Sequence, residues 1–240
     1  DELGTLGEAF NRMGKELSKQ MKMRESFGKY VGTKVVEMIT EKPDQAWLKG
    51  RTAEAAILFA DIRGFTAYAE AREPEEVVEK LNEFFSIATE VILEYDGYID
   101  KFIGDSVLAV FGVPVSQDDH MQRSIEAAIA MQKRLSEASD HTNPLLSSIG
   151  IGIASGVVVA GNIGSQVKME YTVIGDSVNI ASCLNSLAGS GEIVVAGTAG
   201  KELSETHNTE QLSPQKIKDR EELVDAFKIK KMNDTVTFQT

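Results

Sequence analysis

Residues 55–66, with the sequence AAILFADIRGFT, contain the segment that decides the fold. The apolar run 55–60 predicts a strand that is buried on both faces of a sheet. Asp61 ends this run, and residues 62–65 then predict a turn. A carboxylate at the end of a buried strand is costly unless a partner compensates its charge. Asp61 is therefore the first candidate for a functional residue.

The rest of the chain alternates between helical and strand patterns. Helices are expected at 74–95, 117–138 and 176–187, strands at 98–103, 106–111, 170–174, 192–196 and 225–230, and further strand structure within 145–159. Gly104 and Asp105 lie between two of these strands and indicate a hairpin turn. Two strand pairs lie too close in sequence for crossover helices, so we predict an α+β fold with a mixed, mostly antiparallel sheet and helices packed on it.

The first 24 residues predict a helical extension before this fold. Leu3, Leu6, Phe10, Met13 and Leu17 step by three or four residues, which is the spacing of a coiled-coil seam. A helix this short is marginal alone, so it is expected to pair with a second copy or to fold back on its own domain. Residues 25–49 are expected to connect this helix to the domain that follows.

The composition excludes several classes of protein. The 240 residues carry a net charge of −12, which argues against binding nucleic acid through its phosphates. One cysteine, Cys183, excludes an internal disulfide and a cysteine zinc site. No run of about 18 apolar residues predicts a membrane span. The first residues do not resemble a signal peptide, and we expect a soluble fragment of a longer protein.

Asp105 makes a candidate metal site together with Asp61. Neighbouring strands lie about 5 Å apart, so two carboxylates at strand ends can share one or two divalent cations. Mg²⁺ prefers oxygen ligands and often binds one or two carboxylates plus substrate phosphates. The turn at 62–65 could add a carbonyl ligand and N–H groups for a phosphate chain. The alternative is that Asp61 caps a helix near Phe65 and that Asp105 only makes the turn.

Three ordered motifs resemble the class III nucleotide cyclase catalytic domain: FADIRGFT at 59–66, KFIGDS at 101–106 and YTVIGDSVNIA at 171–181. The resemblance covers roughly residues 50–232 and implies a catalytic domain at 50–240 with a ferredoxin-like cyclase core. Residues 1–24 resemble the last helix of a HAMP signalling module. Residues 25–49 resemble the cyclase transducer element that links HAMP to cyclase.

The resemblance implies an adenylate cyclase, which converts ATP to 3′,5′-cyclic AMP and pyrophosphate with two Mg²⁺ or Mn²⁺ ions per site. In this family the ribose 3′-oxygen attacks the α-phosphorus in line. Asp61 and Asp105 match the metal carboxylates, and the backbone carbonyl of Ile62 is a further ligand. Phe65 and Thr66 lie in the turn that meets the phosphates.

The same resemblance assigns the groups that hold the nucleotide. Lys101 and Thr172 match the base-selecting positions, where an ammonium donor and a hydroxyl acceptor favour adenine. The guanylate cyclases of this family have a glutamate and a cysteine at these two positions instead. Asn179 matches the asparagine that orients the ribose. Lys218 matches the polyphosphate lysine, although the glycine that usually follows is aspartate here.

Cys183 departs from the family pattern, which has an arginine at this position to stabilise charge in the transition state. Losing such a donor typically slows a reaction by about 10²–10³-fold. Either the enzyme is slow, or Lys168 or Arg220 substitutes, or the domain is a catalytically silent regulatory dimer that binds ATP. A guanylate cyclase and a structural signalling spacer are the remaining alternatives.

The family's sites lie at a dimer interface, so the resemblance implies a head-to-tail homodimer. Asp61, Asp105 and Lys101 are expected from one chain and Asn179 from the other, with Lys101 and Thr172 reading one base together. HAMP modules normally follow a transmembrane helix. The parent protein is therefore expected to be a receptor with this domain on the cytoplasmic side of the membrane, reached only through missing upstream segments.

Overall fold

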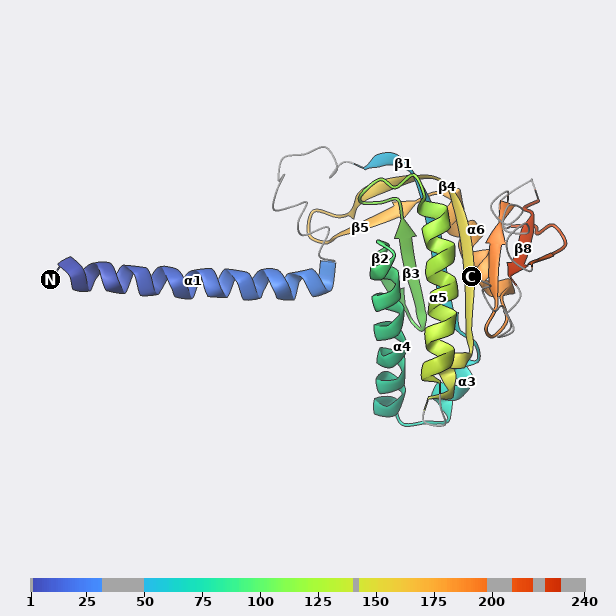
Figure 1. Cartoon of the computed structure of the whole chain (residues 1–240), viewed down its shortest axis with the longest axis horizontal. Coiled ribbons are helices and arrows are strands. Elements are labelled where there is room, and N and C mark those ends of the chain that lie inside the picture. Colours follow the sequence, from blue (N-terminus) through green and yellow to red (C-terminus); the bar gives the residue numbers. More distant parts are fainter. Residues whose placement is uncertain (1, 32–49, 140–142, 198–208, 218–222, 230–240) are drawn as a thin grey trace, which may run out of the picture.

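The computed structural model describes residues 2–31, 50–139, 143–197, 209–217 and 223–229 (Figure 1). Its helices are α1 (Glu2–Val31), α3 (Phe65–Glu70), α4 (Pro74–Glu94), α5 (His120–Ala138) and α6 (Asp176–Leu187), with a short 3₁₀ helix η2 (Pro144–Ser147). Its strands are β1 (Arg51–Ile62), β2 (Tyr98–Ile103), β3 (Ser106–Phe111), β4 (Ile149–Gly164), β5 (Met169–Ile174), β6 (Ile193–Ala196), β7 (Thr209–Gln211) and β8 (Ala226–Ile229).

The strands form one mixed, mostly antiparallel sheet, as the sequence predicts. The order is β2-β3-β1-β4-β6-β8-β7, and β5 pairs with the distal half of β4. β4 and β6 are parallel, and the other described pairs are antiparallel. β1 lies between β3 and β4, so its backbone is paired on both edges.

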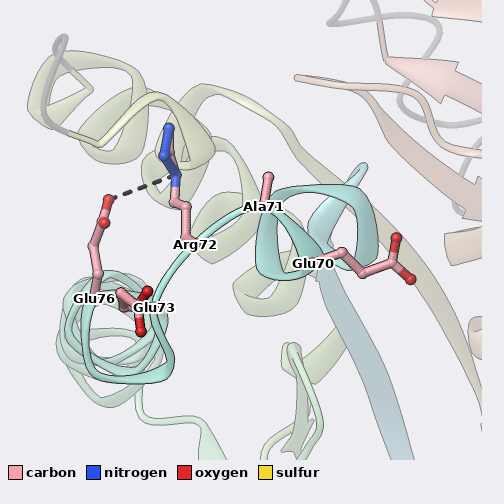
Figure 2. A pocket seen from close by; sticks show the side chains of 5 residues that line it. All are labelled: Glu70, Ala71, Arg72, Glu73 and Glu76. Carbon is pink, nitrogen blue, oxygen red and sulfur yellow. Dashed lines mark ion pairs between the residues drawn. The ribbon is translucent and has the colours of Figure 1, made fainter.

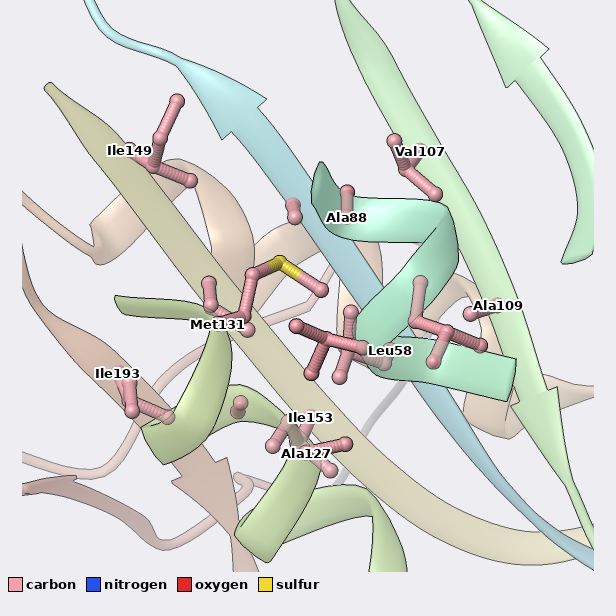
Figure 3. Packing of buried hydrophobic residues seen from close by; sticks show 14 of the residues in the cluster. Leu58, Ala88, Val107, Ala109, Ala127, Met131, Ile149, Ile153 and Ile193 are labelled. Atoms are coloured by element: carbon pink, nitrogen blue, oxygen red, sulfur yellow. The ribbon is translucent and has the colours of Figure 1, made fainter. Parts of the chain in front are cut away.

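Helices cover both faces of this sheet. α4 and α5 lie side by side over one face (Figure 1), where Leu58, Met131 and Ile153 belong to one buried cluster (Figure 3). α6 packs on the opposite face, where Ile57 and Leu184 belong to a second cluster. Residues 55–58 of β1 are fully buried, with successive side chains in alternate clusters. The strand buried on both faces is therefore confirmed.

Several observed element bounds differ from the sequence prediction, and the strand structure expected within 145–159 is β4 at Ile149–Gly164, preceded by the unpredicted η2. The 12-residue β1 begins at Arg51, and the helix predicted from 117 begins at His120. The short elements α3 and β7 were not predicted. Three to six residues carry too little periodicity to distinguish such an element from a turn.

The N-terminal helical extension is present, and α1 projects away from the sheet (Figure 1). It continues to Val31, seven residues into the predicted connector, and the remainder of that connector, 32–49, lies outside the described residues. Four of the five predicted seam residues, Leu6, Phe10, Met13 and Leu17, are exposed. Within the described residues, no helix is both long and apolar enough to cross a membrane.

Gly152 allows α6 to approach β4 closely. A Cβ atom at this position would lie 2.1 Å from the backbone nitrogen of Asn185 and 2.4 Å from the carbonyl oxygen of Ala181. Both atoms belong to helix backbone, so a side-chain rotation cannot relieve the clash. The distance between the sheet and α6 therefore requires glycine here.

We expect Gly152→Ala to lower the free energy of unfolding by about 2 kcal/mol or more, because α6 must move away from its packed position. Gly14→Ala in α1 is the matched control, since a Cβ there meets nothing within 4 Å. Urea unfolding followed by circular dichroism measures both. Equal stability of Gly152→Ala and the parent protein would contradict the close approach.

Candidate active site

Asp61 lies at the end of β1, beside the turn between β2 and β3. The strand register pairs it with Ser106 of β3 and with Gly150 of β4. The Ser106 hydroxyl donates to Asp61 Oδ1 at 2.9 Å, and Arg63 Nη1 lies 3.1 Å from Oδ2. Both oxygens therefore have partners, and the carboxylate is held in one orientation.

Asp105 brings a second carboxyl group to Asp61. It occupies the turn after Gly104, whose φ of 62° is a left-handed conformation that glycine adopts without steric cost. Partial burial, the hydrogen bond with Asp61 and the charge of Asp61 together raise the pKa of Asp105 to about 6. The two aspartates that the sequence places at strand ends therefore lie close enough for their side chains to interact.

This pair fits a divalent cation that also binds substrate oxygens. Two carboxylates in contact repel each other when both are ionised, and a cation between them removes that cost. No group of three or more acidic, histidine or cysteine side chains suited to a metal occurs in the described part of the chain. A closed cage built from side chains alone is thus absent there, and phosphates would complete the coordination.

The alternative role of Asp61 as a helix cap is wrong. Helix α3 begins after Gly64, which is the N-cap residue with φ 76°, and no side chain caps the helix. Phe65 and Thr66 are its first two residues, so their backbone N–H groups belong to the unpaired first turn. Ile62, whose carbonyl is the expected further ligand, is the last residue of β1.

Arg63 and Asn185 support the carboxylate pair and were missed in the sequence. Arg63 Nη2 donates to the backbone oxygen of Asn185 at 2.5 Å and to its Oδ1 at 3.1 Å. Asn185 Nδ2 in turn donates to the carbonyl oxygens of Phe59 and Gly150, at 3.1 and 2.9 Å. α6 is thereby joined to β1 and β4 at the level of Asp61. The sequence feature that could have indicated Asn185 is its polar amide within the apolar stripe of α6, next to buried Leu184.

The two predicted base-selecting residues lie close together within one chain. The Thr172 hydroxyl donates to Asp100 Oδ2 at 2.7 Å, and Lys101 Nζ lies 3.4 Å from Asp100 Oδ1. Lys101 also donates to Glu170 at 2.7 Å. Because one chain holds both residues, their joint reading of a base does not by itself require a second chain, which corrects that step of the sequence argument.

Charge and burial act against each other in this cluster. Burial is the largest influence on Asp100 and raises the pKa of its carboxyl, against the hydrogen bond from Thr172 and the charge of Lys101. Burial also acts to lower the pKa of Lys101, but the bond to Glu170 and the charge of Asp100 prevail and raise it. Lys101 is therefore an ammonium donor at neutral pH.

Asn179 and Cys183 lie one helical turn apart on α6. Asn179 is exposed, and the free thiol of Cys183 is partly buried beside the second core cluster. Of the two cations that could replace the missing arginine, Lys168 pairs with Glu170 at 3.4 Å. Arg220 and the predicted polyphosphate residue Lys218 lie outside the described residues.

A separate hollow of about 440 Å³ lies at the junction of α3 and α4 (Figure 2). Residues 70–73 and Glu76 line it, and an ion pair of 3.5 Å joins Arg72 Nε to Glu76. None of the predicted site residues lines this hollow. We therefore place the candidate active site at the carboxylate pair and the base-selecting cluster.

Comparison with known proteins identifies sequences related to this chain. The profile described as "Adenylate and Guanylate cyclase catalytic domain" matches residues 48–231. The uncharacterized proteins Rv1320c and Rv1319c of Mycobacterium tuberculosis are 38% and 36% identical over 190 and 189 residues. Each match covers 79% of this chain, but only 32% and 34% of the relative. The chain thus spans about a third of the length of these curated relatives.

Solved structures agree with the profile. The adenylyl cyclase CyaB from P. aeruginosa superposes with a TM-score of 0.69 at 28% identity, covering 78% of this chain and 99% of that one. The guanylyl cyclase Cya2 gives 0.66 at 33% identity, covering 75% and 93%. A bacterial light-regulated adenylyl cyclase gives 0.74 at 26% identity, covering 90% and 64%. The chain therefore belongs to the family of adenylate and guanylate cyclase catalytic domains.

Proposed function

We propose that this domain converts ATP to 3′,5′-cyclic AMP and pyrophosphate. The observation that carries the proposal is the interaction between the Asp61 side chain at the end of β1 and the Asp105 side chain in the turn between β2 and β3. The relatives include both adenylyl and guanylyl cyclases, so the choice of ATP depends on the residues that face the base. Lys101 and Thr172 supply that argument.

Asp61, Asp105 and the carbonyl of Ile62 would hold Mg²⁺ or Mn²⁺. Divalent ions at such a site lower the pKa of the attacking hydroxyl and neutralise the leaving pyrophosphate. The chain itself orients Asp61 through Ser106 and Arg63. The first turn of α3, with Phe65 and Thr66, presents N–H groups to the phosphates. Lys218 is proposed to bind the polyphosphate as well.

The base-selecting cluster supports adenine over guanine. Lys101 has three N–H donors, of which Glu170 takes one and Asp100 attracts a second. A third remains for the N1 acceptor of adenine. Guanine carries N1–H at that position, so two donors would oppose each other. The guanylate cyclase alternative requires this cluster to rearrange.

We propose a head-to-tail homodimer in which Asn179 of one chain meets a nucleotide bound by Asp61 of the other. Asn185 anchors α6 at the level of Asp61, and Asn179 lies six residues earlier, about 9 Å along the helix axis. Asn179 is also exposed, as an interface residue would be in a single chain. The exposed apolar seam of α1 supports pairing of the same two chains.

The upstream arrangement is proposed from the sequence resemblance. Residues 1–24 would be the end of a HAMP module and residues 25–49 a cyclase transducer element, leading into the catalytic domain at 50–240. The parent protein would then be a membrane receptor with this domain on its cytoplasmic side. A rotation or shift of paired α1 helices would reach the two active sites through that connector.

The second candidate function is a catalytically silent regulator that binds ATP as a dimer. One observation favours it: position 183 carries a thiol without fixed charge, and the candidate replacement cation Lys168 is paired with Glu170. The carboxylate pair favours turnover, because a binding module has no need to hold two repelling carboxylates in contact. We therefore propose a functional cyclase that is slowed at the charge-stabilising step.

We expect Asp61→Asn and Asn179→Ala to be inactive alone and to regain activity when mixed. Random pairing makes about half of the dimers mixed, and in each mixed dimer one of the two sites receives both native residues. About a quarter of parental activity should therefore return. Cyclic AMP formation from ATP, in Mg²⁺ and in Mn²⁺, measures this. Activity of Asp61→Asn alone or of Asn179→Ala alone would contradict the proposed role of the substituted residue. A mixture that stays inactive would contradict the shared site.

We expect Asp105→Asn to stabilise the metal-free protein at pH 8. The folded-state pKa of about 6 exceeds the ordinary value of 3.8, so this carboxyl favours the fold when protonated and loses that contribution as the pH rises from 4 to 6. The group is only partly buried and solvent screens its charge, so the gain should be about 1 kcal/mol and should vanish near pH 4. Urea unfolding in EDTA measures it.

Asp119→Asn is the control, because Arg123 holds the pKa of Asp119 below its usual range. That substitution should not stabilise the protein at pH 8. Equal effects of the two substitutions would show that the gain at position 105 does not come from the repulsion by Asp61.

We expect Cys183→Arg to raise kcat by about 10²-fold, because it restores a fixed positive charge beside the reacting phosphate. KM should change little, since the charge acts mainly in the transition state. Cys183→Ala is the matched control and should match the parent. Steady-state kinetics of cyclic AMP formation measures all three proteins. An unchanged kcat in Cys183→Arg would remove position 183 from the reaction.

A further inference from the structure

Asp100 is the residue that joins the two base-selecting side chains, and no sequence motif pointed to it. The register of β2 against β3 shifts between Ile99 and Lys101, which makes Asp100 the extra residue of a β-bulge. A bulge re-aims side chains that would alternate in a regular strand. As a result, Asp100 and Lys101 both contact residues of β5. The Asp100 side chain is fully buried.

The hydrogen bonds around Asp100 determine the direction of the Thr172 hydroxyl. Asp100 Oδ2 receives two groups: Thr172 Oγ1 at 2.7 Å and the backbone nitrogen of Val173 at 3.3 Å. An N–H group can only donate, so Oδ2 acts as an acceptor toward Val173. The hydroxyl proton of Thr172 therefore also points at Oδ2. Only the lone pairs of the Thr172 oxygen remain for a ligand.

The other carboxylate oxygen acts on Lys101. Asp100 Oδ1 is buried and has no hydrogen-bond partner among the described atoms, while Lys101 Nζ lies 3.4 Å away. This distance fits an ion pair. A buried carboxylate oxygen with one nearby cation holds that cation on its side of the cluster. Lys101 is thereby restrained between Asp100 and Glu170.

We propose that Asp100 sets the nucleotide preference by making Thr172 an acceptor only and by fixing Lys101 as the neighbouring donor. This inference rests on the proposed function, in which these two side chains face the base. An acceptor beside a donor complements the amino group and N1 of adenine. It opposes O6 and N1–H of guanine, which present the reverse order. Asp100 is a positioning residue, since it acts through Thr172 and Lys101.

The test compares ATP and GTP in competition for a fluorescent nucleotide bound in the presence of Mn²⁺, together with turnover of each. The parent should prefer ATP, and Asp100→Ala should reduce the ATP-to-GTP affinity ratio by about tenfold, because the freed Thr172 hydroxyl can then donate to O6. Thr172→Val should reduce the ratio similarly. The double variant should lose less than the two single effects combined, because the part of the Asp100 effect that acts through the Thr172 hydroxyl is already removed in Thr172→Val.

Tyr98→Phe is the matched control. It removes another hydrogen bond between β2 and β5, from the Tyr98 hydroxyl to the carbonyl oxygen of Tyr171 at 3.1 Å, without touching Thr172. A general loosening of the two strands would change the ratio in this variant too. We expect Tyr98→Phe to keep the parental ratio, and loss of the preference there would overturn the assignment to Asp100.

Two further variants keep the test decisive if Asp100→Ala does not fold. Asp100→Asn retains a carbonyl that can accept from Thr172 and should keep most of the ATP preference. Thr172→Ser retains the hydroxyl and should keep it as well, whereas Thr172→Val should not. Loss of the preference in Thr172→Ser, or its survival in Thr172→Val, would overturn the proposal.

The outcomes separate this inference from the proposed function. A parent that prefers ATP and forms cyclic AMP, with an unchanged ratio in Asp100→Ala, overturns only the role of Asp100. A parent that prefers ATP without forming cyclic AMP overturns the proposed reaction, and the affinity ratios then decide the role of Asp100. A parent that binds neither nucleotide, or prefers GTP, overturns both.

Discussion

The repulsion between Asp61 and Asp105 is the interaction on which the rest of the site depends. Two neighbouring carboxyl groups are unfavourable in the absence of a cation, and the pKa of Asp105 is raised first by burial and then by the hydrogen bond and charge of Asp61. The fold tolerates the pair because Ser106 and Arg63 compensate Asp61 on its other sides. The electrostatic cost of the folded domain is thus concentrated where metal and phosphate would relieve it.

The surrounding sheet makes this contact unavoidable. β1 is paired on both edges, and its side chains from Ala55 to Leu58 are fully buried, so Asp61 cannot withdraw from the strand end. Asn185 then fixes α6 to two neighbouring strands at the same level. Gly152 determines how close that helix comes. Packing on both faces of the sheet therefore fixes the position of the two carboxylates.

The sequence predicted the elements whose pattern is local and missed the contacts that depend on tertiary structure. The apolar run before Asp61 and the Gly104-Asp105 hairpin identify two strand ends, and both were found where expected. Asp100 and Asn185 could not be assigned roles in this way. Thr172 lies 72 residues from Asp100 and Phe59 lies 126 residues from Asn185, and a bulge alters the direction of the Asp100 side chain. Lys218 could not be placed, because it lies outside the described residues.

The carboxylate pair and the base-selecting cluster are the two halves of the site, and they differ in how their charges are compensated. At Asp61 and Asp105 like charges are held together, and binding of a cation would release the strain. At Asp100, Lys101 and Glu170 unlike charges compensate one another before any ligand arrives. On the proposed function, the first half would therefore gain the most from metal and phosphate, whereas the second would hold its donors and acceptors in place to discriminate between bases. Discrimination needs fixed donors and acceptors, because a group free to rotate would satisfy either base. In the role proposed for it, the buried carboxylate of Asp100 removes that freedom from Thr172, which would account for a costly buried charge at this position.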